Sequence, residues 1–379
     1  MTSFLTDNIK IITDQVATFA IENIAQLDDL HKSDEFPVKL WGEMGEAGLL
    51  AVGIPTKYGG SGGSALTISM AGHELVKNGN NIGIGLSWLI HQLSAHFIIN
   101  KFGTEEQKDK YLPKIATGEM TTCFAVSEPN TGAHPKHLKT VAEELSDGYT
   151  LNGEKTYLTN GPIADLFIVI AVTGIDSGKK LYSAYIVPKG TQGVEIAEPI
   201  KLPFFKPSPH GGIILTDCSV PKNALIGNRD TMYDDLVLPF RDIEDALIMG
   251  IVTGALEKQF ILLTELLRNN NIELEDSLKM EVGKLKTMLD ISKYISYEAA
   301  RIVDSSMEHP EKTSLLLYFR NLARDYHVQI EIILKLTKLE KNGLLETLTN
   351  ELAASARLGS NVVKIKQMRL GESSIYSHS

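Results

Sequence analysis

The sequence has little cysteine and lacks the common metal-binding patterns. Its two cysteines, Cys123 and Cys218, lie far apart in 379 residues, which excludes a disulfide framework and a multi-cysteine zinc site. The ten histidines never fall into a metal spacing such as His-Glu-x-x-His, so we assign no metal. We expect the protein to work in a reducing cytoplasm.

Long apolar runs and excess positive charge are also missing. Continuous apolar stretches such as 166–172 are far shorter than the roughly 20 residues of a membrane-spanning helix. The first fifteen residues are interrupted by charges such as Asp7 and Lys10, unlike the core of a secretory signal. The formal net charge of −10 would repel a phosphate backbone. We therefore expect a soluble protein that binds neither membrane nor nucleic acid.

Length and apolar spacing predict several domains, beginning with helices. The 379 residues exceed what one core usually absorbs, and a hydrophobic content of 43% is ordinary for globular proteins. From Asp7 to about Met120 the apolar residues recur at intervals of three and four, which predicts helices. The glycine-rich stretch 58–63 interrupts them. No Gly-Lys-Ser or Gly-Lys-Thr follows it, so a spacer is favoured over a phosphate-binding loop.

The central region changes to short β-branched and aromatic runs, which predict strands of an antiparallel sandwich or barrel. Four dipeptides carry turn signals between these runs: Asp147-Gly148, Asn152-Gly153, Asn160-Gly161 and Lys189-Gly190. No Gly-x-Gly-x-x-Gly opens a βαβ unit, so a Rossmann site is not supported.

Helical periodicity returns from Asp234 to Ser360, with breaks near Asn269–Asn271 and His309–Pro310. The helical, strand and helical patterns of these three regions predict an α+β chain of several layers. Its expected parts are an N-terminal helical domain (1–120), a central antiparallel β-domain (121–230) and a C-terminal helical bundle (231–379).

Five sequence blocks match one known family in order and spacing. They are 48–60, 101–113, Phe124–Ala133, Leu151–Gly161 and the end of the β-region, Gly212–Gly227. In these blocks the chain resembles the acyl-CoA dehydrogenase family. The resemblance implies the acyl-CoA dehydrogenase fold, with a four-helix bundle at the C-terminus, and an FAD bound on the β-domain.

The resemblance also assigns the residues around FAD. Val126 and Ser127 match the segment whose backbone amides and hydroxyl contact the pyrimidine edge of the isoalloxazine, where fixed donors stabilise developing charge. Tyr157 matches the aromatic residue that flanks the ring, usually a tryptophan, and Thr159 matches the hydroxyl near N5. The full predicted cofactor set is Phe124, Val126, Ser127, Gly132, Ala133, Tyr157, Leu158 and Thr159. Ala133 stands where the family commonly has serine near the pyrophosphate, and His134 where it has aspartate.

The catalytic base departs from the family pattern. Dehydrogenation beside a thioester needs a carboxylate to remove the Cα proton. The two positions that usually supply it hold Leu370 and Phe240. Glu244 lies one turn beyond Phe240 on the same helix face, and we predict that it is the base. A structural alternative is that Glu244 pairs with Arg241, and Glu372 is the competing base.

Substrate contacts follow from the same resemblance. The backbone N–H of Leu370, with the flavin ribityl hydroxyl, would polarise the thioester carbonyl. Arg241 matches the arginine at the phosphate end of CoA, although it could equally brace the fold, and Phe240 lines the pocket. The Arg-x-x-Phe-Gly element that reaches a neighbouring FAD is replaced by Arg268–Ile272, so we expect the adenine end of FAD to be held differently.

The displaced base and altered CoA end resemble the prolyl-carrier-protein oxidases of natural-product biosynthesis. That branch implies a prolyl thioester on an acyl or peptidyl carrier protein, a homotetramer, and oxygen or an electron-transferring flavoprotein as acceptor. The alternatives are a short-chain acyl-CoA dehydrogenase, a non-catalytic flavin- or acyl-binding homologue, and a flavin monooxygenase. The acidic chain attracts an acidic carrier only where lysines and arginines cluster locally.

Overall fold

The computed structural model describes residues 6–305, 311–358 and 360–376 of the chain. The chain divides into two compact units, neither of which is continuous in sequence. Unit 1 comprises Met1–His31, Ala65–Ile82 and Asp245–Ser379, and unit 2 comprises Lys32–Ser64 and Gly83–Glu244.

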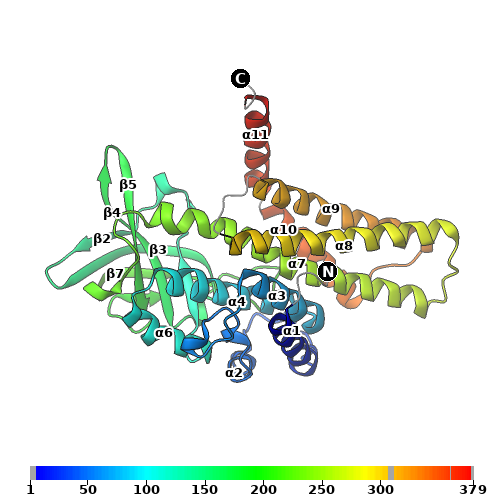
Figure 1. The fold of residues 1–379 in the computed structure, drawn as a ribbon, viewed down its shortest axis with the longest axis horizontal. Coiled ribbons are helices and arrows are strands. Elements are labelled where there is room, and N and C mark those ends of the chain that lie inside the picture. The colour runs from blue at the N-terminus through cyan, green and yellow to red at the C-terminus, as the bar shows by residue number, and fades with distance from the viewer. Residues whose placement is uncertain (1–5, 306–310, 359, 377–379) are drawn as a thin grey trace. The chain divides into compact units, whose positions relative to one another are not determined.

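Helices dominate both ends of the chain (Figure 1). They are α1 (Asp7–Phe19), α2 (Val38–Glu46), α3 (Ala65–Gly79), α4 (Ile82–Leu93), α5 (Asn100–Phe102), α6 (Glu105–Ala116), α7 (Leu238–Asn269), α8 (Asp276–Asp304), α9 (Lys312–Thr337), α10 (Gly343–Leu358) and α11 (Ser360–Tyr376). A π-helical turn, η10 (Tyr233–Val237), leads directly into α7.

The strands all belong to unit 2 and form one eight-stranded sheet. They are β1 (Thr122–Ala125), β2 (Val141–Glu144), β3 (Gly148–Thr159), β4 (Leu166–Asp176), β5 (Lys179–Pro188), β6 (Val194–Ile196), β7 (His210–Pro221) and β8 (Leu225–Ile226). The order across the sheet is β6-β7-β3-β2-β4-β5-β8, and β1 pairs in parallel with β4.

The apolar run of β4 explains its central place in the sheet. Residues 166–171 are all buried, as expected for a strand covered on both faces. The core of the sheet includes Phe167, Val169, Tyr185 and Ile213. The predicted central β-region is therefore built around one well-packed sheet.

Three of the four predicted turn signals are confirmed, and one is wrong. Asp147-Gly148 joins β2 to β3, Asn160-Gly161 follows β3, and Lys189-Gly190 follows β5. Asn152-Gly153 instead lies inside β3, at a bulge opposite β7. Gly153 has φ +150°, and a Cβ there would lie 2.7 Å from the Cα of Thr140. Close approach of the segment that precedes β2, not a chain reversal, therefore requires this glycine.

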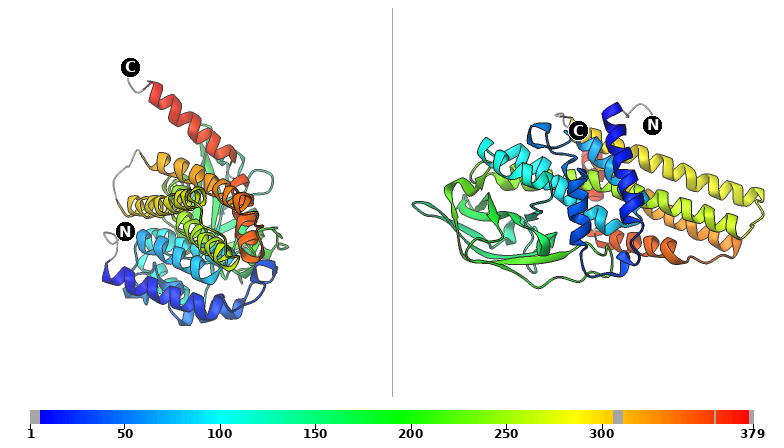
Figure 2. Two further views of the ribbon diagram at one scale, coloured as in Figure 1. Left: turned by 90° about the vertical axis from the view of Figure 1, so that its right-hand side faces the viewer. Right: turned by 90° about the horizontal axis from the view of Figure 1, so that it is seen from below.

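Long helices make up most of unit 1. Helices α8 and α9 run alongside each other and are seen nearly end-on in the left panel of Figure 2. Ala299, Phe319 and Leu322 belong to the core that packs them together. Helix α7 ends at Asn269, which confirms the predicted break there. The break predicted at His309–Pro310 lies outside the described residues.

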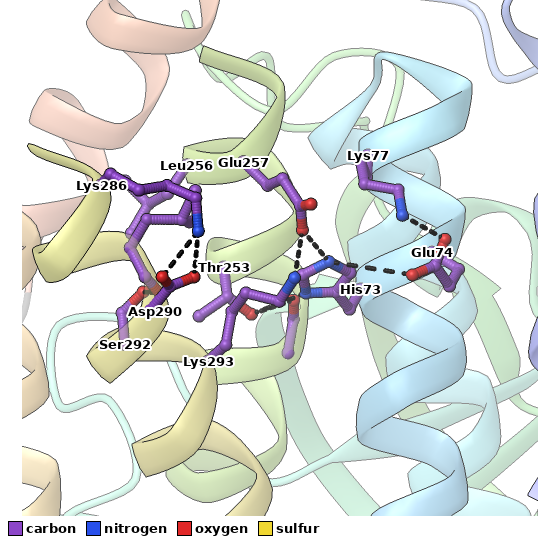
Figure 3. Close-up of polar contacts among 12 residues, drawn as sticks. His73, Glu74, Lys77, Thr253, Leu256, Glu257, Lys286, Asp290, Ser292 and Lys293 are labelled. Carbon is purple, nitrogen blue, oxygen red and sulfur yellow. Dashed lines mark hydrogen bonds and ion pairs between the residues drawn. The ribbon is translucent and has the colours of Figure 1, made fainter. Parts of the chain in front are cut away.

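A buried polar cluster joins α3, α7 and α8 within unit 1 (Figure 3). The imidazole of His73 is fully buried, with Nε2 2.6 Å from Glu257 Oε2 and Nδ1 3.2 Å from Thr253 Oγ1. Lys293 donates to the same Glu257 oxygen at 2.7 Å. Burial tends to raise the pKa of Glu257, but His73 and Lys293 outweigh it and hold the pKa well below its usual value.

Two helical stretches differ from the expectation that every apolar run is far shorter than a membrane-spanning helix. Ile82–Phe102 and Tyr233–Asn269 each meet the length and hydropathy of a membrane span. The most apolar windows of these stretches are 89% and 61% buried within the structure, a property of core helices. The expected length of the apolar stretches was wrong, because each of these helices continues through isolated polar residues that end an uninterrupted apolar run.

Candidate functional site

The two segments predicted to contact the cofactor lie side by side in unit 2. The first follows the end of β1, and the second forms the last part of β3. The N–H of Thr156 donates to the carbonyl of Ser127 at 2.9 Å and joins them directly. The structure thus brings together residues that are about thirty positions apart in the sequence.

A buried ion pair holds the same two segments. Lys155 is 0% exposed and Glu128 is 5% exposed, and the Lys155 ammonium lies 2.9 Å from Glu128 Oε1. Glu128 also accepts the backbone N–H groups of Lys139 and Thr140. Burial lowers the pKa of Lys155 to about 8, and Glu128 opposes that shift. Burial alone would raise the pKa of Glu128, but Lys155 and Thr140 together lower it.

The ammonium of Lys155 also fixes a backbone orientation. It donates to the carbonyl of Val126 at 3.0 Å, from the buried side. Because a trans peptide is planar, the following N–H, that of Ser127, points to the opposite side. This arrangement presents a backbone donor where the resemblance predicts contact with the pyrimidine edge.

Tyr157 lies at a second bulge of β3 and turns outward. Its φ is +55°, and the register of β3 against β7 shifts between Lys155 and Leu158. The ring is 63% exposed on the structure, whereas Leu158 is buried in the sheet core. A planar aromatic held outward by a bulge is suited to cover the face of a bound ring.

The hydroxyl of Thr159 is oriented by a histidine that the sequence analysis missed. His210 Nδ1 lies 3.0 Å from the carbonyl of Ser208 and donates to it. Burial lowers the pKa of His210, so the ring is neutral and its Nε2 accepts the Thr159 hydroxyl at 3.2 Å. The oxygen lone pairs of Thr159 are then available to an external donor.

The turn between β1 and β2 contains a buried hydroxyl with no partner in the described part of the chain. This atom is Oγ1 of Thr131. It precedes Gly132, whose φ of +56° places it in the left-handed region, with open space where a Cβ would lie. A buried hydroxyl without a partner is costly unless a ligand or water satisfies it.

The start of α7 reaches the first cofactor segment. The rings of Phe240 and Phe124 are 4.6 Å apart at their centroids, with an interplanar angle of 59°. The predicted substrate residue thus packs against a predicted cofactor residue. Glu244 is half-buried at the next turn of the same helix, on the face of Phe240.

Arg241 is linked to the same loop through a tyrosine. The Tyr233 hydroxyl donates to the carbonyl of Ala133 at 2.9 Å. Burial raises the pKa of Tyr233, and the positive charge of Arg241, together with a hydrogen bond from it, acts in the opposite direction. The arginine itself is exposed. Arg241 therefore braces the loop that carries Ala133 while presenting part of its charge outward.

Two predicted residues lie in unit 1 rather than with this group. Leu370 and Glu372 are on α11, where Leu370 is half-buried and Glu372 is exposed. Their roles stay predictions.

Sequence reasoning missed Lys155, Glu128, His210 and Tyr233. Glu128 and Lys155 lie inside the blocks that carry the resemblance, and a lysine in a predicted strand was a usable signal. His210 and Tyr233 are supplied by distant segments and had no local signal.

Comparison with known proteins identifies the family. Residues 6–119 match the acyl-CoA dehydrogenase N-terminal domain, and residues 123–218 match the middle domain. The mitochondrial isovaleryl-CoA dehydrogenase of Arabidopsis thaliana is 30% identical over 322 residues, which are 82% of this chain and 77% of that protein. The chain belongs to the acyl-CoA dehydrogenase family.

Two further proteins resemble this chain. An L-prolyl-[peptidyl-carrier protein] dehydrogenase of Pseudomonas fluorescens is 34% identical over 215 residues, which are 56% of each chain. The FAD complex of PigA has the same fold, with a TM-score of 0.80 and 23% identity over 97% of this chain and 98% of that one. The predicted acyl-CoA dehydrogenase fold is confirmed.

As a member of this family the protein is a flavin-dependent oxidoreductase with FAD as its cofactor. The residues of unit 2 fit that cofactor, since they offer the outward Tyr157 ring, the directed Ser127 N–H, and the Thr131 hydroxyl, which has no partner among the described residues. When bound, FAD supplies a two-electron acceptor for hydride. The chain's own residues supply the shape, the donors and the proton acceptor.

Proposed function

We propose that the protein oxidises an acyl thioester, and that the acyl group is L-proline tethered to a peptidyl carrier protein. The observation that carries this proposal is the contact between Phe240 and Phe124, which fills a usual base position with an aromatic pair. A pocket without its usual base needs a carboxylate from another turn, and Glu244 is one turn away. The named activity of the relative from Pseudomonas fluorescens supports the same substrate.

In the proposed reaction Glu244 removes the proton from Cα of the thioester. When bound, FAD would accept the hydride from Cβ, so that the substrate would gain a Cα–Cβ double bond as its Cα–H and Cβ–H bonds break. The resulting enamine isomerises to the imine by moving a proton. Two electrons leave the substrate, and oxygen or an electron-transferring flavoprotein removes them afterwards. We further propose that the enzyme is a cytoplasmic homotetramer.

The second candidate is a short-chain acyl-CoA dehydrogenase. Similarity to the isovaleryl-CoA dehydrogenase extends over 82% of this chain, compared with 56% for the prolyl-carrier relative. The two candidates share the cofactor and the type of reaction. They differ in what presents the thioester, so a substrate panel separates them.

The test uses FAD-loaded protein mixed anaerobically with prolyl carrier protein or with short acyl-CoAs. We expect the oxidised-flavin absorbance to bleach with the prolyl carrier and to persist with acyl-CoA. The reverse pattern would establish the second candidate. Bleaching with neither substrate would contradict both.

The base is tested by two matched amide substitutions. Glu244→Gln removes only a proton acceptor, so it should keep FAD and lose roughly 10²-fold or more of the bleaching rate. Glu372→Gln, on α11, should bleach at the wild-type rate. If the two results are exchanged, Glu372 is the base and our assignment is wrong.

A further inference from the structure

The loop that follows the cofactor segment is a dense run of cationic and imidazole side chains. Residues 134–139 read His-Pro-Lys-His-Leu-Lys, and residues 133–140 contain no acid. The side chains of His134, Lys136, His137 and Lys139 are exposed. This cluster contrasts with a chain whose net charge is −10. We call residues 134–139 the basic loop.

The basic loop is anchored from beneath through its backbone carbonyls. The carbonyl of Leu138 accepts from Lys180 Nζ at 2.6 Å, and the carbonyl of Pro135 accepts from the Tyr182 hydroxyl. Immediately before the loop, the carbonyl of Ala133 accepts from Tyr233. Three carbonyls are thus drawn toward side chains of β5 and η10, Leu138 is buried, and the two lysines and two histidines of the loop remain exposed. Its backbone is therefore held in place while its cationic side chains face outward.

The basic loop lies beside the predicted site. Tyr233 connects it to the exposed Arg241, whose neighbour Phe240 contacts Phe124. The loop also begins one residue after Ala133, a predicted cofactor residue. A partner that binds the loop therefore sits next to residues predicted to contact the cofactor and the substrate, Ala133 and Arg241. Complementary charge speeds such encounters and fixes their orientation.

We infer that the basic loop, with Arg241, docks the acidic surface of the carrier protein that delivers the thioester. This inference rests on the proposed function, because it names the surface by which the tethered substrate arrives. Lys136 and Lys139 carry the attraction. It adds a specificity that the flavin site lacks, since a free thioester does not need the loop.

The experiment measures binding and turnover separately on full-length, FAD-loaded protein. An acidic peptidyl carrier protein, fluorescently labelled, is titrated both without its phosphopantetheine arm and with the arm loaded with proline. Turnover is measured with the loaded carrier and with a prolyl-pantetheine thioester that has neither protein nor phosphate. The variants are Lys136→Glu/Lys139→Glu, Lys136→Arg, and the control Lys189→Glu.

Lys189 is a suitable control because it is an exposed lysine of the same unit. Lys180 anchors the basic loop, and Lys189 lies nine residues beyond it, just after β5 ends at Pro188. Lys180 and Lys189 are therefore about 30 Å apart along the strand direction. We expect at least tenfold weaker carrier binding for the double variant, with a smaller salt dependence. Lys136→Arg and Lys189→Glu should bind as the wild type does. Turnover of the small thioester should be unchanged in all three.

Several results would overturn the docking surface. They are wild-type binding by the double variant, no carrier binding by the wild type, equal loss of small-thioester turnover, and binding that requires the arm and is displaced by free phosphopantetheine. Failure of the proposed function is separate: the wild type would then oxidise neither prolyl substrate. Lysine-dependent carrier binding would still support the docking surface in that case.

Discussion

Replacing Lys155 with methionine should destabilise unit 2 far more than an ordinary surface charge change. The substitution keeps the chain length in a fully buried position but strands the Glu128 carboxylate, which is 5% exposed. Breaking a buried pair by removing one partner typically costs about 3–5 kcal/mol. Glu128 keeps two backbone donors, so we expect about 3 kcal/mol. For a cooperative unit of this size that corresponds to roughly 6–12 °C in Tm.

The double variant Lys155→Met/Glu128→Gln removes the stranded charge. Replacing both members of a buried pair is often nearly neutral, so we expect recovery to within about 1 kcal/mol of the wild type. The assay is denaturant unfolding followed by tryptophan fluorescence and circular dichroism, without FAD and then with it. FAD affinity should fall in Lys155→Met because the Val126 carbonyl loses its ammonium donor.

The reasoning is refuted by either of two results. One is a cost below about 1 kcal/mol for Lys155→Met, within the range of exposed ion pairs. The other is a double variant whose loss equals the sum of both single losses, because that result denies any coupling between the two charges.

Three further predictions concern the described interactions. Glu257→Gln should cost about 1–3 kcal/mol in unfolding free energy, because the buried His73 and the half-buried Lys293 lose a charged acceptor. Asp290→Asn, in an exposed helical pair, should cost less than about 0.5 kcal/mol. Lys155 has a pKa of about 8 in the folded protein against 10.5 for its ordinary value, so between these values the unfolded chain binds more protons. Wild-type stability relative to Lys155→Met should therefore rise as pH increases from 8 to 10.5, and a fall in pH-dependent unfolding curves would contradict the shift. Gly153→Ala should cost about 2–4 kcal/mol by thermal unfolding, because its φ and the nearby Thr140 backbone leave no room for a Cβ, and an unchanged Tm would be inconsistent with the bulge.

Local patterns predicted the order of elements well because each rests on near neighbours. The spacing of apolar residues predicted the helices before Met120 and the end of α7, and the apolar run at 166–172 became the buried strand β4. The prediction of a turn at Asn152-Gly153 was wrong because a turn and a bulge both require the conformational freedom of glycine. Only the position of Thr140 on a neighbouring segment decides between them.

The candidate site was predictable where its residues lie in continuous blocks. Ser127 and Tyr157 were found from such blocks, and the structure joins their segments through backbone hydrogen bonding. The supporting groups His210 and Tyr233 were not predictable, because they reach the site through pairings of β7 and the turn before α7. The contact between Phe240 and Phe124 likewise depends on tertiary packing.

The most direct test of the central claim is the mass of the acyl group after one anaerobic turnover of prolyl carrier protein with FAD-loaded enzyme. The account predicts a thioester lighter by the mass of two hydrogen atoms, formed together with flavin bleaching, and little of it with Glu244→Gln. An unchanged prolyl thioester beside a fully oxidised flavin in the wild type would contradict the proposed oxidation.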